Sequence, residues 1–103
     1  MQAPFSDQGR FETKNASRYL QQLCKHFAHK IEVQFDQTAG TANFPFGVAI
    51  MAATDDALIV DLTADTVEGL KRGRIAIDSH LETFAFREAF KSMDWAALRT
   101  DAV

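Results

Sequence analysis

The feature that most restricts the fold of this chain is the alternation of residues near its centre. Apolar side chains occupy every even position from residue 42 to residue 52. Successive side chains of a β-strand point to opposite faces, so a period of two indicates a strand with one buried face. Residues 31–36 and 58–62 alternate in the same way. The middle of the chain is therefore expected to form a sheet.

The even positions stay in step through Pro45, which restricts how this segment can turn. A two-residue hairpin at Pro45-Phe46 would place the residues that flank the turn on the same face and would break the alternation. We therefore predict one long strand over residues 42–52, bent at Pro45 and Gly47, with the proline at a bulge or on an edge. A three-residue loop would also keep the alternation.

Two segments have the spacing of amphipathic helices. Asn15 is a suitable N-cap, and the apolar residues that follow it predict a helix from residue 16 to about residue 30. Asp65 and Glu68 resemble a capping box, which predicts a second helix that ends near residue 88. Gly73 lies on the core stripe of this helix, where glycine lowers the stability of the helix by about 1 kcal/mol relative to alanine. Its presence there indicates a close approach to the sheet or to the first helix.

With a short strand at residues 10–14, the expected order of elements is β-α-β-β-β-α. The simplest arrangement is a two-layer α+β fold, an antiparallel sheet with two helices packed on one face. A chain of 103 residues is expected to form a single domain over residues 1–103. Residues 1–9 and 99–103 are expected to be loose ends, and the segment around Trp95 should fold back or pair with another chain.

Composition restricts the class of partner. The net charge of −3 disfavours nucleic acid, although Lys71, Arg72 and Arg74 weakly resemble the basic helix start of a double-stranded-RNA-binding domain. The single Cys24 excludes an internal disulfide and falls on the core stripe of the first helix, so we expect it to be buried and inert. No apolar run approaches the length of a membrane span, and a cytoplasmic location is expected.

Three segments resemble a known family. SRYLQQLCKHFAHK (residues 17–30), FPFG (44–47) and HLETFAFRE (80–88) are similar to the characteristic segments of a bacterial family, domain of unknown function 2218. The resemblance extends over residues 10–95. It implies a small protein associated with siderophore and iron handling, because some members are encoded near, or fused to, siderophore-interacting flavin reductases. It does not define a reaction.

The polar side chains on the two helices form one candidate site. Tyr19 and His26 lie on one flank of the first helix, and His80 and Arg87 lie on one flank of the second. If the helices pack side by side, His26 and His80 can face each other across the groove. We therefore name Tyr19, His26, His80 and Arg87 as candidate ligand-binding residues, with the arginine for an anion and the tyrosine for stacking or hydrogen bonding.

An alternative interpretation is that these four are ordinary flank residues, bonded to backbone groups and carboxylates. No carboxylate has the spacing of a metal ligand beside the histidines, so neither a metal nor a cofactor is expected. The chain has no Walker loop, no GxGxxG, no GxSxG and no HExxH motif. Lys71, Arg72 and Arg74 are more simply explained as a solvated helix face than as an anion site.

Association is indicated by three apolar residues, Ile75, Phe86 and Phe90, on the side of the second helix opposite its core stripe. Either the Trp95 segment covers them or a second subunit does, and a homodimer is our prediction.

The first functional hypothesis is a non-catalytic accessory or small-ligand-binding domain linked to siderophore and iron handling. The alternatives are an interaction module that docks on a flavin reductase, and a small enzyme with His26 or His80 as general base.

Overall fold

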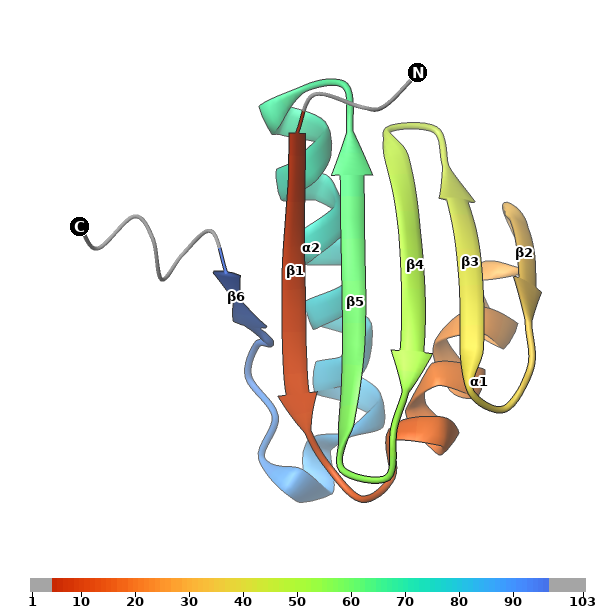
Figure 1. Ribbon diagram of the computed structural model, residues 1–103, viewed down its shortest axis with the longest axis vertical. Coiled ribbons are helices and arrows are strands. Elements are labelled where there is room, and N and C mark those ends of the chain that lie inside the picture. The colour runs from red at the N-terminus through yellow and green to blue at the C-terminus, as the bar shows by residue number, and fades with distance from the viewer. Residues whose placement is uncertain (1–4, 97–103) are drawn as a thin grey trace.

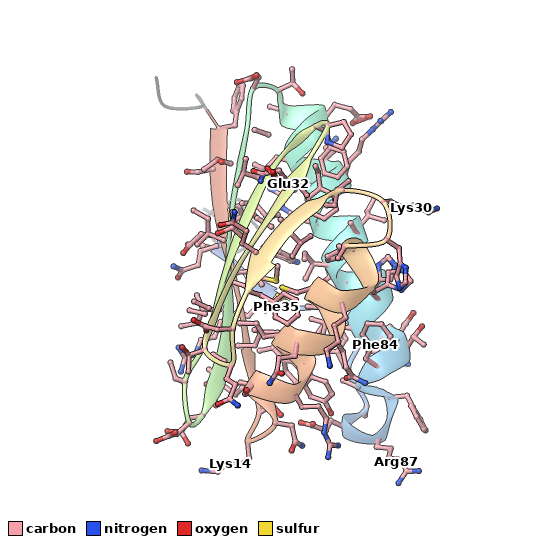
Figure 2. All side chains as sticks on the ribbon, turned by 90° about the vertical axis from the view of Figure 1, so that its right-hand side faces the viewer. Lys14, Lys30, Glu32, Phe35, Phe84 and Arg87 are labelled. Atoms are coloured by element: carbon pink, nitrogen blue, oxygen red, sulfur yellow. The ribbon has the colours of Figure 1, made fainter. Side chains whose placement is uncertain are left out.

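The computed structural model describes residues 5–96 and has a six-stranded antiparallel sheet with two helices (Figure 1). Its elements are β1 (Phe5–Glu12), α1 (Ala16–Phe27), β2 (Glu32–Phe35), β3 (Ala39–Phe44), β4 (Gly47–Ala53), β5 (Ala57–Ala64), α2 (Val67–Phe84), a 3₁₀ turn (Phe86–Glu88) and β6 (Asp94–Trp95). The strand order is β2-β3-β4-β5-β1-β6. Both helices cover the same face, as Figure 2 shows edge-on. The predicted two-layer α+β fold is confirmed.

The core lies between the helices and the sheet. The helices contribute Leu20, Leu23, Ile77 and Leu81, and the sheet contributes Met51, Leu58 and Val60, all of them fully buried. Each such side chain stabilises the fold by about 1.5–3 kcal/mol relative to an exposed one. Cys24 lies in the same core, and burial raises the pKa of its thiol to about 11. The thiol is therefore protonated at neutral pH and is part of the packing.

The prediction of one long strand over residues 42–52 is wrong. The segment is a hairpin in which Phe44 pairs with Gly47, so that the turn is the two residues Pro45 and Phe46. The alternation breaks there, as the parity argument requires: Ala42 and Ala49 face the core, and Ile50 faces the opposite side of the sheet. The prediction failed because it assigned every apolar residue of the segment to the buried face. Those of β4 lie on both faces.

The expectation that residues 1–9 form a loose end is wrong for residues 5–9. These residues are the first part of β1, which pairs with β5 along its whole length. The polar sequence conceals this strand because its stability comes from distant contacts. The buried carboxylate of Asp7 accepts a hydrogen bond of 2.7 Å from Nε of Arg74, and Gly9 lies under the ring of Trp95. Residues 1–4 and 97–103 lie outside the described part.

The segment after α2 folds back over the sheet edge. Trp95 is buried in β6 and pairs with Gly9 of β1. The carboxylate of Asp78 accepts hydrogen bonds of 2.9 Å from the Trp95 indole nitrogen and the Met93 backbone N–H. Phe90 is also buried, with its ring 4.7 Å from that of Phe11. Of the three residues proposed for association, Phe90 is therefore internal, whereas Ile75 and Phe86 remain exposed.

Helix α2 starts one residue later than predicted, because Thr66 is its N-cap and accepts a hydrogen bond of 2.9 Å from the Gly69 N–H. The expected close approach at Gly73 is confirmed. A Cβ added there would lie 3.0 Å from a methyl carbon of Leu62 in β5. The missing side chain lets α2 lie directly on the sheet.

We predict that Ala89→Gly stabilises the protein. Ala89 has a φ of 56°, a left-handed conformation that costs a residue with a Cβ about 1–2 kcal/mol. Replacement by glycine should raise the free energy of unfolding by about 0.5–1 kcal/mol, since the gain is partly offset by a more flexible unfolded chain. Urea denaturation measures the change.

The matched control is Ala28→Gly. Ala28 is also exposed at a helix end but has a right-handed φ of −62°, so glycine should destabilise by about 0.5–1 kcal/mol. A loss of stability in both variants would contradict the left-handed conformation of Ala89.

Candidate functional site

The site lies where the helical layer is incomplete. Helix α1 has 12 residues and α2 has 18, which corresponds to lengths of about 18 Å and 27 Å. The shorter helix ends well before the β3–β4 turn, which lies at the top of the sheet (Figure 1). A cavity of about 500 Å³ opens beside this turn, and we call it the interhelical pocket. Its lining residues are His26, Phe27, His29, Lys30, Ile31, Phe44, Phe46, Arg72, Ile75, Ala76 and His80.

Three phenylalanines form the aromatic wall of the pocket. The rings of Phe44 and Phe46, on either side of Pro45, are stacked with their centroids 4.9 Å apart. Phe27, at the end of α1, meets the Phe44 ring edge-on at 5.0 Å. The Phe46 carbonyl oxygen lies close to the backbone of α2 at Gly69, where an added Cβ would be only 2.5 Å from it. This close contact fixes the turn against α2. The wall is therefore held by backbone packing.

The two predicted histidines meet at one end of this wall. The ring centroids of His26, in the last turn of α1, and His80, in α2, are 4.4 Å apart. Nδ1 of His80 lies 2.6 Å from the carbonyl oxygen of Ala76. Because a carbonyl can only accept, Nδ1 must carry the proton, and Nε2 of the neutral ring is left as an acceptor. Phe84 lies about as close to His26 as to His80, at 6.1 and 6.3 Å.

His26 is held in its neutral form. Partial desolvation lowers its pKa below the ordinary 6.5, and electrostatic interaction with His80, His29 and Lys30, each of which is positive when protonated, lowers it further. If His26 took up a proton, it would add a positive charge beside the other basic groups, which is unfavourable. At neutral pH, His26 therefore presents an uncharged ring with a nitrogen that can accept a hydrogen bond.

Tyr19 and Arg87 do not line the pocket, so the predicted group of four side chains is not formed. Tyr19 is on the same flank as His26 but seven residues earlier, about 10 Å along the helix. Arg87 follows α2 and lies over the Phe86 ring, with its guanidinium carbon 5.6 Å from the ring centroid. Figure 2 shows Arg87 at the lower end of the helical layer, well away from Lys30.

Tyr19 belongs to a separate polar cluster that holds the end of α2 against the start of α1. Its hydroxyl donates to Oε2 of Glu88, which also accepts from Thr13 at 3.0 Å and Asn15 at 3.1 Å. Partial desolvation opposes ionisation of Glu88, but these three hydrogen bonds outweigh it and lower the pKa of the carboxyl. Burial and the bond to Glu88 raise the pKa of Tyr19. The tyrosine thus has a structural role.

Several lining residues were missed in the sequence. Phe44 and Phe46 were assigned to a single strand, and Arg72 was interpreted as part of a solvated face. Ile75 was assigned to an association surface. The available signal was the Phe-Pro-Phe-Gly segment, because a proline between two aromatic residues is as typical of a tight turn as of a bent strand.

Comparison with known proteins identifies the family but no activity. Residues 8–96 match the family described as an uncharacterized protein conserved in bacteria, DUF2218. The chain belongs to this family. The NMR structure of PA4090 from Pseudomonas aeruginosa is similar, with a TM-score of 0.74 and 26% sequence identity over 88% of this chain and 94% of that one. No curated protein matches the chain. The function of this DUF2218 protein must therefore be argued from its site.

Within residues 5–96, no three His, Cys, Asp or Glu side chains are grouped to hold a metal ion. Neither described helix has both the length and the apolar character needed to span a bilayer.

We predict that the histidine pair is visible in an NMR titration. His26 should titrate below 6.5, and His80→Gln should raise the His26 pKa by removing a neighbour that is positive when protonated, though desolvation keeps it below 6.5. Since the folded chain binds this proton less readily than the unfolded chain, His26 lowers the free energy of unfolding as the pH falls below 6.5.

The control is His29→Gln, since His29 has a smaller electrostatic effect on His26 than His80 has and its removal should raise the His26 pKa less. An unchanged His26 pKa in His80→Gln would contradict the contact between the two rings.

Proposed function

We propose that this DUF2218 protein is a non-catalytic domain that binds a small molecule in the interhelical pocket. The observation that carries the proposal is a cavity of about 500 Å³ with an aromatic wall and a histidine pair at one end. Natural ligand sites are typically concave and apolar, with a few polar groups and a volume of about 300–1,000 Å³. The pocket has each of these properties.

The apolar surface of the pocket is larger than the fold requires. Ile75 is 66% exposed at its rim, and Phe44 and Phe46 are only half-buried. Exposed apolar side chains that gather at a concave place are typical of binding sites. A ligand that covers them would gain about 25 cal/mol for each Å² of apolar surface removed from water.

Four more specific proposals concern the biological role, the partner, the oligomeric state and the location. A role in siderophore and iron handling, and docking on a siderophore-interacting flavin reductase, rest on the family resemblance alone. A homodimer is supported by the exposed side chains of Ile50 and Phe86, which lie outside the pocket. We also propose a cytoplasmic location, on the basis of the absence of a disulfide framework in the sequence.

A small enzyme with His26 or His80 as general base is the second candidate. It is supported by the lowered pKa of His26 and by the acceptor nitrogen Nε2 of neutral His80. A general base must lie within about 3 Å of the proton that it removes. In this case a compound that binds would be converted to product, and His80→Gln would abolish conversion while binding persists.

We predict that Ala76→Trp blocks the pocket. A thermal-shift screen of aromatic compounds, ferric siderophores, flavins and common anions should identify a ligand of the unmodified chain. At a concentration 100 times its dissociation constant, a ligand raises the free energy of unfolding by about 2.7 kcal/mol, which raises the Tm of a domain of this size by about 12 °C. Ala76 lines the cavity, so the indole should fill it and abolish this shift.

Ser79→Trp is the matched control, since Ser79 is exposed on the same helix and does not line the pocket. It should keep the thermal shift. The proposal fails if Ala76→Trp folds and retains the full shift.

A further inference from the structure

The charges around the interhelical pocket differ from those of the whole chain. The chain carries a net charge of −3, yet no lining residue is acidic. The basic lining residues are His26, His29, Lys30, Arg72 and His80. Low-dielectric aromatic walls strengthen the field of charges that line a cavity. The pocket is therefore a positive site on a negative protein.

Arg72 has no carboxylate partner in the described part of the chain, in contrast to its neighbour Arg74. The Arg74 side chain is 18% exposed and is paired with Asp7 at 2.7 Å. No ion pair between residues 5 and 96 includes Arg72, whose side chain reaches the pocket instead. Two arginines of one turn of α2 thus have different roles. Arg74 holds β1, and Arg72 is available to a ligand.

Two basic lining residues, Arg72 and His80, lie along α2, and the aromatic wall faces the same cavity. Arg72 and His80 are eight residues apart, about 12 Å along the helix axis. Ile75 and Ala76 lie between them on α2, and the stacked rings of Phe44 and Phe46 line the same cavity. A flat apolar body fits between these walls, because aromatic rings pack well against stacked or edge-on neighbours. A negative group at one end of that body would meet the Arg72 guanidinium.

We propose that the ligand is a planar aromatic carboxylate, with its ring system against Phe44, Phe46 and Ile75 and its carboxylate on the Arg72 guanidinium. This proposal rests on the function proposed above and defines the chemical class of the ligand. A guanidinium binds a carboxylate through two parallel hydrogen bonds, which gives both affinity and orientation. A neutral ligand would leave the charged Lys30 and Arg72 side chains without a counter-charge, and a cationic one would be repelled by them.

The test uses a matched pair of probes, 2-naphthoate and 2-naphthamide, which differ in charge but hardly in size. Their affinities for the full chain are measured by isothermal titration calorimetry, and the place of binding by NMR shifts of the backbone amides. We expect the carboxylate to bind about tenfold or more tightly than the amide, as for one charge-assisted hydrogen bond or better. The shifts should gather at residues 26–31, 44–47 and 72–80.

Two variants separate a local contact from a general charge effect. Arg72→Gln and Lys71→Gln remove the same charge from adjacent exposed positions of α2, but only Arg72 lines the pocket. Arg72→Gln should lower the affinity for 2-naphthoate by about tenfold and leave the affinity for 2-naphthamide unchanged. Lys71→Gln should lower the affinity for 2-naphthoate by less than about twofold, since salt screens an exposed charge that does not line the pocket.

The outcomes distinguish this proposal from the one on which it rests. Equal binding of the two probes at the pocket residues would overturn the carboxylate class and leave the ligand-binding function in place. Equal losses in Arg72→Gln and Lys71→Gln would overturn the specific contact with Arg72. If neither probe shifts the pocket residues and the thermal-shift screen is also negative, the proposed function itself fails.

Discussion

Helix α2 lies in direct contact with the sheet because two of its residues have no side chain. Gly69 faces the carbonyl oxygen of Phe46, and Gly73 faces the side chain of Leu62. A Cβ at either position would meet these atoms at or below 3.0 Å. This contact determines where the β3–β4 turn lies and how deep the adjoining pocket is. Arg72, Ile75 and His80 then project from a helix whose height above the sheet is fixed.

Polar anchors hold the other parts of the molecule. The ion pair of Asp7 with Arg74 joins β1 to α2, and Asp78 ties the segment of Trp95 to the same helix. Glu88 connects the end of α2 to the start of α1. In each anchor the hydrogen-bond donors and the carboxylate acceptor are paired with one another. The basic groups of the pocket have no such carboxylate among its lining residues, which is why the pocket and not these anchors is the place for an external ligand.

The features that local periodicity encodes could be predicted from the sequence. Helical spacing placed His26 and His80 on facing flanks, and their rings are 4.4 Å apart. The same spacing carries no information on position along the groove, so Tyr19 and Arg87 were grouped with them although they lie at its other end. The family and the two-layer fold also followed from short segments and their order.

The features that depend on distant contacts could not be predicted in this way. The first half of β1 contains Asp7 and Gly9, which disfavour strands unless a partner such as Arg74 or Trp95 is present. The β3–β4 hairpin was missed because β4 has apolar residues on both faces, and no single periodicity describes such a strand. Both failures concern tertiary context, which overrides local preference.

The two-residue turn at Pro45-Phe46 also limits how the pocket can change in evolution. An inserted residue would either shift β4 by one position against β3, which moves Ala49 and Met51 from the core to the open face, or lengthen the turn that carries Phe46. The turn forms part of the pocket wall and also sets the register of the sheet, so its length cannot vary freely. Relatives with different ligands should therefore differ by substitution at the lining positions, while the turn keeps its length.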